Sequence, residues 1–176
     1  MSDTAHEAKP IWLNPFGQQG LDFHKAAERL KKIVHRTPLQ YNPRLSARYN
    51  CHVYLKREDL QVVRSYKIRG AYNMMSTLPA EMTRNGVVCA SAGNHAQGFA
   101  YSCQKLHVHG VVFMPVITPR QKINQTRMFG GEWIEIRLEG DTFDDCALAA
   151  RRFTEENRMT FIPPFDDPRI VEGQGT

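Results

Sequence analysis

Short apolar runs alternate along the chain with longer stretches of helical periodicity, and this alternation is the feature that most limits the fold. The apolar runs begin at Val53, Val87, Val111, Trp133 and Phe161. Helical periodicity covers residues 21–34, 65–78, 94–106, 119–129 and 141–157. Strands that alternate with helices of this length form crossover units on a mostly parallel sheet. The sequence therefore predicts an α/β fold, with an open, mostly parallel sheet and helices on both faces.

Glycines and an Asp-Pro pair indicate where elements begin and end. Gly86, Gly110 and the pair at residues 130–131 each stand before an apolar run, where a helix has to end. Asp167 followed by Pro168 is typical of a helix start, with Asp as the N-cap and Pro in the first turn. Because only eight residues follow Pro168, we expect the chain to be a truncated piece of a longer protein.

Composition and charge disfavour several classes of protein. The 23 Lys and Arg against 18 Asp and Glu give a net charge of +5, but the basic residues are scattered, so no nucleic-acid partner is predicted. No stretch is long enough to span a membrane, and residues 1–9 lack an apolar signal core. No metal site or disulfide framework is suggested by the widely spaced cysteines, which are Cys51, Cys89, Cys103 and Cys146. We expect a cytoplasmic protein with reduced cysteines.

Lys67 is the first candidate for chemistry, because it lies in the first turn of the predicted helix that opens at Ser65. The positive end of the helix dipole disfavours the ammonium form of such a lysine. The neutral amine that remains is the form that attacks a carbonyl carbon. On position alone, an ordinary solvated lysine is the more common interpretation, so Lys67 needs a companion motif.

That companion is the loop between the predicted strand at residues 87–90 and the next helix, made of Ser91, Ala92, Gly93, Asn94 and His95. Small residues let the backbone approach a ligand, and unpaired amides at a helix start bind a carboxylate or phosphate. Asn94 offers a donor and an acceptor, while His95 either donates to the same anion or caps the turn. A tight turn capped by Asn is the alternative. Ligands bind at the carboxyl ends of strands in open α/β sheets, so this loop and Lys67 are expected to face one cleft.

Three motifs in this order resemble the biosynthetic threonine ammonia-lyases (threonine dehydratases), which are fold-type II pyridoxal-phosphate enzymes. The motifs are KREDLQ at residues 56–61, SYKIRGA at residues 65–71 and ASAGNHAQG at residues 90–98. The resemblance implies pyridoxal 5'-phosphate as the cofactor, bound covalently by Lys67, which then acts as the base at the substrate α-carbon. It also implies that Asn94 hydrogen-bonds the phenolic oxygen of the cofactor and that the loop from Ser91 to His95 holds the substrate carboxylate.

The reaction implied by the resemblance is the dehydration and deamination of L-threonine, secondarily L-serine, to 2-oxobutanoate and ammonia, the first step of isoleucine biosynthesis. Two residues depart from relatives of this fold. Tyr66 stands where many have Phe, which keeps an aromatic ring beside the lysine. Ala92 stands where serine racemases have a serine that protonates the opposite face, which favours elimination over racemisation.

Domain organisation also follows from the resemblance. It assigns residues 1–58 to a larger cofactor domain, residues 59–160 to a small α/β domain and residues 161–176 to a return into the larger one. The family's Gly-rich phosphate-binding loop has no counterpart in the 176 residues, so we expect the isolated chain to be inactive. The full-length enzyme is expected to be a homo-oligomer, commonly a tetramer in the family.

Two other functions compete with this interpretation of the sequence. The chain is alternatively a non-catalytic α/β module that binds a small anion or a partner through residues 91–95. A nucleotide-binding Rossmann domain is disfavoured, because the sequence has no Gly-x-Gly-x-x-Gly turn with an acidic residue downstream.

Overall fold

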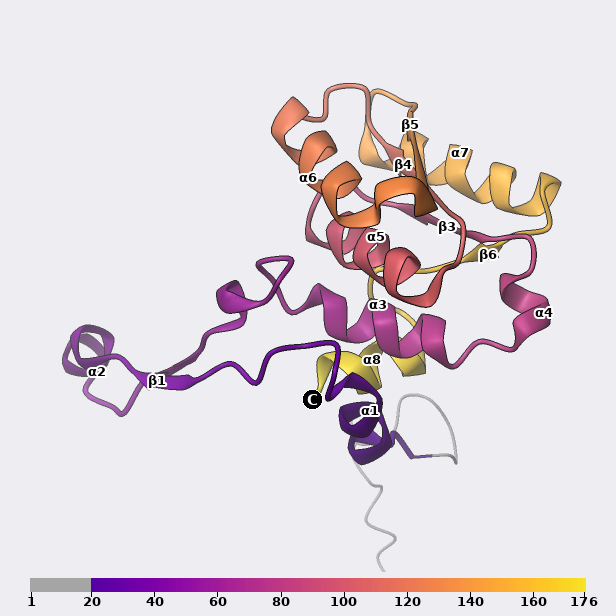
Figure 1. Ribbon diagram of the computed structural model, residues 1–176. Helices are drawn as coiled ribbons and strands as arrows, with labels where there is room; N and C mark the ends of the chain where they lie inside the picture. The colour runs from indigo at the N-terminus through magenta and orange to yellow at the C-terminus, as the bar shows by residue number, and fades with distance from the viewer. Residues whose placement is uncertain (1–19) are drawn as a thin grey trace, which may run out of the picture.

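The computed structural model describes residues 20–176, so the prediction about residues 1–9 lies outside the described residues. A central sheet consists of β3 (Val87–Ala90), β4 (Gly110–Met114), β5 (Ile134–Leu138) and β6 (Thr160–Phe161). Its strand order is β5-β4-β3-β6, and every neighbouring pair is parallel (Figure 1). The predicted α/β class with an open parallel sheet is confirmed.

Helices cover both faces of this sheet, as Figure 1 shows. They are α5 (Asn94–Leu106) and α6 (Arg120–Gly130) on one face and α7 (Phe143–Glu156) on the other. Cys89 of β3 packs in one core with Phe99 of α5, while Ala90 packs in a second core with Ala150 of α7. Because β3 is buried on both faces, the position of the loop at its carboxyl end is well defined.

A further layer of helices lies under α5, away from the sheet (Figure 1). It consists of α3 (Lys67–Ser76), α8 (Pro168–Gln174) and α1 (Phe23–Leu30). A Cβ on Gly173 of α8 would meet the backbone of Arg69, so α8 and α3 are in close contact. The predicted start of α8 is confirmed, because Asp167 accepts a hydrogen bond from the Arg169 N–H at 2.8 Å and Pro168 opens the helix.

The apolar run at Val53 does not join the parallel sheet, and its prediction as part of that sheet was wrong. Its residues enter β2 (Tyr54–Lys56), which pairs antiparallel with β1 (Leu39–Tyr41). With α2 (Pro43–Tyr49), this exposed hairpin forms an arm that extends from the other elements (Figure 1). A three-residue partner strand carries too little periodicity to be predicted.

The predicted glycine turns differ in their physical cause. Gly86 and Gly131 have φ values of +98° and +55°, a region that favours glycine. Gly110, in contrast, is the first residue of β4, and α5 ends at His107, which has a φ of 54°. A Cβ on Gly110 would collide with Cys103 of α5. Gly110 therefore permits close packing of a helix on the sheet and does not end the helix.

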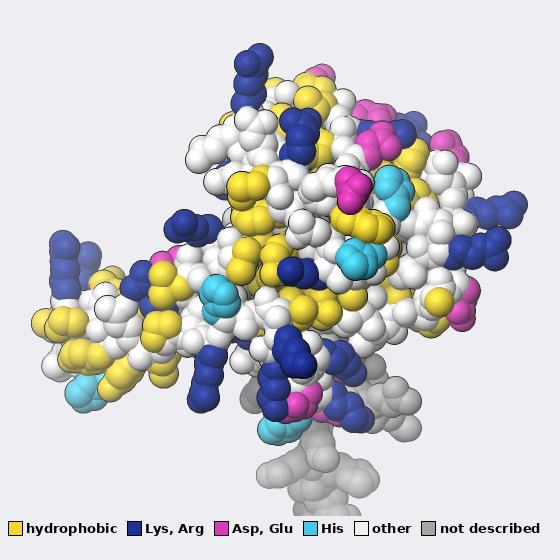
Figure 2. Space-filling view, viewed as in Figure 1, with side chains coloured by type: hydrophobic (Ala, Val, Ile, Leu, Met, Phe, Trp, Pro, Cys, Tyr) yellow, Lys and Arg dark blue, Asp and Glu magenta, His cyan; other side chains and the backbone are white. Residues whose placement is uncertain are grey.

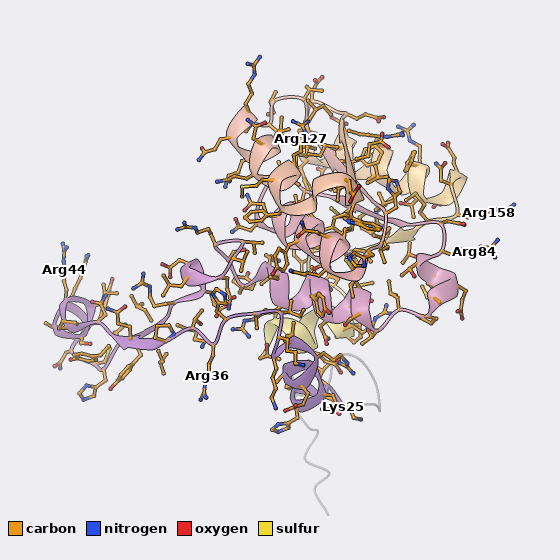
Figure 3. All side chains as sticks on the ribbon, viewed as in Figure 1. Lys25, Arg36, Arg44, Arg84, Arg127 and Arg158 are labelled. Atoms are coloured by element: carbon orange, nitrogen blue, oxygen red, sulfur yellow. The ribbon has the colours of Figure 1, made fainter. Side chains whose placement is uncertain are left out.

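Charged side chains are distributed over several elements. Lys25, Arg44, Arg127 and Arg158 project from separate parts of the chain (Figure 3). On the face seen in Figure 2, Lys and Arg are interspersed with uncharged surface. Among the helices of residues 20–176, none combines the length and the apolar character that a membrane crossing requires. Shorter helical segments complete the fold: α4 (Ala80–Thr83), η2 (Glu58–Leu60) and η3 (Gly131–Trp133).

Candidate active site

Lys67 is the first residue of α3, and its amine lies against the segment that follows β6. Its Nζ donates a hydrogen bond to the carbonyl oxygen of Pro164 at 2.7 Å and lies 5.2 Å from the centroid of the Phe165 ring. Partial burial lowers the pKa of the Lys67 amine. No ion pair within residues 20–176 involves Lys67. An amine with a lowered pKa and no carboxylate partner has a larger neutral fraction, which is the reactive form.

The loop from Ser91 to Asn94 lies at the carboxyl end of β3. The Ser91 N–H donates to the carbonyl oxygen of Phe113 at 3.0 Å, and Ser91 Oγ accepts from the Gly93 N–H at 3.2 Å. A Cβ on Gly93 would meet nothing within 4 Å, so the space beside this residue is open. The Asn94 side chain is exposed. The start of α5 therefore faces open space with backbone amides that lack intrahelical acceptors, as an anion site requires.

His95 points into the interior. Its side chain is buried, and Nε2 lies 3.1 Å from the carbonyl oxygen of Ile162. Because a carbonyl only accepts, Nε2 must carry the hydrogen, and Nδ1 is left buried without a partner. Burial lowers the pKa of His95 to about 4, so the ring is neutral near pH 7. The imidazole is thus turned away from the exposed Asn94 side chain, and a contact between His95 and the substrate carboxylate would run through its backbone N–H.

Close packing of α5 on α3 brings the two helix starts together. Gly98 lies one turn after His95, and a Cβ there would stand 2.9 Å from both the Lys67 carbonyl carbon and the Ile68 nitrogen. Lys67 and His95 then contact carbonyls that are two residues apart, those of Pro164 and Ile162. The structure therefore brings Lys67 and His95 to the same segment of chain.

Of the predicted site residues, only Lys67 lines the cavity that lies beside its side chain. This cavity has a volume of about 470 Å³. It is lined by Phe23, Tyr66, Lys67, Pro164, Phe165, Ile170, Val171, Gln174 and Gly175. The other predicted site residues lie outside this lining: Ser91, Ala92, Gly93, Asn94 and His95. Their roles in binding stay predictions.

Gly98→Ala tests whether this packing is required. The added methyl would press against backbone atoms, which cannot move as a side chain does, so we expect a loss of about 1.5 kcal/mol in the free energy of unfolding, measured by urea denaturation. Gly93→Ala is the matched control, because its methyl enters open space. Equal losses for the two variants would contradict the close approach of α5 to α3.

A buried ion pair that sequence reasoning missed holds the start of α3. Both oxygens of Glu58 accept from Arg69, from Nε and Nη2, at 2.8 Å. Burial opposes the charge of Glu58, but hydrogen bonds from Arg69, Thr37 and Gln61 outweigh it and lower the pKa of Glu58 to about 2. Glu58 and Arg69 fall within two motifs used for the resemblance, but a separation of eleven positions carries no periodic signal that predicts their contact.

The residues around Lys67 fit one end of a pyridoxal-phosphate molecule. Ser65 Oγ and Gln174 Nε2, the second of which belongs to the lining of the Lys67 cavity, are buried without hydrogen-bond partners among the described residues, and such atoms mark places where a further group is needed. The Lys67 amine, whose pKa is lowered by burial, suits an aldehyde, and the loop before α5 suits an anionic group. No stretch of the sequence matches a Gly-rich phosphate loop, so the fit covers the reactive end of the cofactor only.

A parallel α/β sheet with a partly buried lysine at one helix start and an Asn-containing loop at the next agrees with the fold of the fold-type II pyridoxal-phosphate enzymes. The chain belongs to the pyridoxal-phosphate dependent enzyme family, which matches residues 30–176.

Relatives within this family are threonine dehydratases. The chain is 59% identical over 152 residues to the L-threonine dehydratase biosynthetic IlvA of Bacillus subtilis. The matched residues make up 86% of this chain and 36% of the relative. The corresponding protein of Staphylococcus aureus is 54% identical over 155 residues, covering 88% and 37%. The chain thus spans somewhat more than a third of the length of these relatives.

Solved structures of related enzymes share the fold of this chain. Processed threonine deaminase isoform 2 from Solanum lycopersicum has a TM-score of 0.79 at 40% identity, covering 91% of this chain and 45% of that one. Maize serine racemase has a TM-score of 0.80 at 27% identity, covering 87% and 46%. The fold predicted from the resemblance is confirmed.

Proposed function

We propose that the protein catalyses the dehydration and deamination of L-threonine, and secondarily of L-serine, with pyridoxal 5'-phosphate as cofactor. The products from L-threonine are 2-oxobutanoate and ammonia, because the water lost from the β-carbon is regained on hydrolysis. The observation that carries this proposal is the amine of Lys67, which is partly buried, has a lowered pKa and pairs with no carboxylate within residues 20–176. The names of the relatives give L-threonine as their substrate and call them biosynthetic, and we propose the first step of isoleucine biosynthesis as the place of this reaction.

The role of each site residue is the one that the resemblance to threonine ammonia-lyases implies. Lys67 would hold the cofactor through Nζ and, once free, would take the proton from the substrate α-carbon. Asn94, exposed at the start of α5, would donate its side-chain amide to the phenolic oxygen of the cofactor. The backbone amides from Ser91 to His95 hold the substrate carboxylate, and the methyl of Ala92 offers no proton at the opposite face. When bound, the cofactor supplies an electron sink for the α-carbon.

The division of the chain into domains is also a proposal that rests on the resemblance to the family. The division into residues 1–58, 59–160 and 161–176 is supported by contacts between its first and last parts, since the Asp22 N–H donates to Glu172 Oε1 at 2.9 Å. We also propose a homo-oligomer in the cytoplasm, a state that sedimentation of the purified complete gene product would test. For the 176 residues alone we propose negligible turnover, because no Gly-rich loop orients the cofactor.

Product analysis tests the proposed reaction. The complete gene product is saturated with pyridoxal 5'-phosphate and given L-threonine or L-serine. We expect 2-oxobutanoate and ammonia in equal amounts from L-threonine, with slower formation of the corresponding oxo acid from L-serine. Conversion of L-serine to D-serine without oxo acid would contradict the proposal in favour of racemisation.

A further inference from the structure

The segment Ile162–Pro164 passes the starts of both α3 and α5. Pro163 and Pro164 have no backbone N–H, so neither can extend the pairing of β6. Two side chains bind carbonyl oxygens of this segment: His95 binds that of Ile162, at 3.1 Å, and Lys67 binds that of Pro164, at 2.7 Å. The segment therefore connects the two helix starts through a short, stiff stretch of backbone.

The contact at Ile162 is rigid. The Ile162 N–H donates to the carbonyl oxygen of Val88 in β3 at 2.8 Å, and its carbonyl accepts from His95 on the other side. The His95 ring is buried and neutral, so it has one N–H to give, and that N–H is committed to Ile162. The position of the following prolines relative to β3 is thereby set.

At the other end of the segment, the Lys67 amine has one strong acceptor. Its Nζ lies 5.2 Å from the centroid of the Phe165 ring and 5.5 Å from that of the Tyr66 ring, and these rings offer only their faces. The Pro164 carbonyl is the acceptor. A neutral amine that donates one N–H to a carbonyl keeps its lone pair for a proton or a carbonyl carbon.

We propose that His95 is a positioning residue for Lys67: by fixing the Ile162–Pro164 segment, it keeps the Pro164 carbonyl where it holds the lysine amine whenever that amine is free of cofactor. The inference rests on the proposed function, in which Lys67 is released by substrate and then acts as a base. It gives the buried imidazole a role distinct from contact with the substrate carboxylate.

Two variants that differ only in reach test this role. Glutamine at position 95 carries an amide nitrogen about where Nε2 of the histidine lies, whereas asparagine ends near Nδ1 and falls short of Ile162. The purified complete gene product, freed of cofactor, is labelled with a limiting amount of an amine-acetylating reagent across a range of pH. Mass spectrometry then gives the labelling of Lys67 relative to Lys25, which is exposed on α1.

For His95→Gln we expect the pH midpoint of Lys67 labelling to match the wild type. For His95→Asn we expect it to rise by roughly half a pH unit, because the loosened segment lets water reach the amine. An unchanged midpoint in His95→Asn, or an equal rise in both variants, would overturn the proposal. If His95→Asn does not fold, His95→Gln decides alone, since a raised midpoint overturns the proposal and an unchanged one supports it. Because no cofactor is present, failure here is separate from failure of the proposed reaction.

Discussion

Lys67→Arg is expected to lower the turnover of L-threonine by the complete gene product at least ~1,000-fold. Arginine keeps the positive charge and much of the length of the side chain, but its guanidinium stays protonated and cannot attack a carbonyl carbon or take a proton from a carbon acid. The loss is therefore a loss of chemistry and not of charge. Formation of 2-oxobutanoate under saturating cofactor and substrate is the measurement.

Lys105→Arg is the matched control for this prediction. Lys105 is an exposed lysine near the end of α5, with Nζ 5.2 Å from the centroid of the Tyr101 ring. Arginine preserves that contact with an aromatic face. We expect turnover within about twofold of the wild type, because the substitution is far from the reacting atoms. Comparable losses in the two variants would show that Lys67 has no special role.

Glu58→Gln is expected to destabilise the chain by about 3 kcal/mol, the lower end of the range for breaking a buried ion pair. The side chains of Arg69 and Glu58 are only 8% and 15% exposed, so the variant would leave the guanidinium without a counter-charge in the interior. Urea unfolding near pH 7 gives the free energy of unfolding. Asp59→Asn is the control, because its pair with Arg57 is exposed and its loss should be much smaller.

The same pair predicts a dependence of stability on pH. The pKa of Glu58 is about 2 in the folded chain against 4.5 ordinarily, so folding favours the ionised carboxylate. The contribution of ionised Glu58 to the free energy of unfolding is complete above pH 4.5 and disappears as the pH falls towards 2. The difference in unfolding free energy between wild type and Glu58→Gln should therefore shrink across this window. A constant difference would contradict the assignment of the low pKa.

Elements with strong local signals were predicted well from the sequence. The helix expected at residues 94–106 is α5 with the same bounds, because small residues and Asn open it after a buried strand. The helix start at Asp167 and Pro168 is likewise a local feature, set by one side chain and one ring. Such features depend on neighbours within a few positions, which a sequence displays directly.

What the sequence does not display is the direction of side chains across long separations. His95 was expected to donate to a bound anion or to cap the turn. Its ring is instead buried and contacts the carbonyl oxygen of Ile162, 67 positions away. Glu58 of η2 and Arg69 of α3 are brought together by the chain between these two helices. The hairpin of β1 and β2 likewise depends on the pairing of two strands of three residues each. These contacts are settled by tertiary packing, which periodicity does not encode.

The site of covalent attachment tests the central claim most directly. The complete gene product is saturated with pyridoxal 5'-phosphate, reduced with borohydride, digested and analysed by mass spectrometry. We predict a pyridoxyl group on the peptide that carries Lys67, on no other lysine in stoichiometric amount, and on no peptide of Lys67→Arg. A stoichiometric pyridoxyl group on a different lysine, with Lys67 unmodified, would contradict the account.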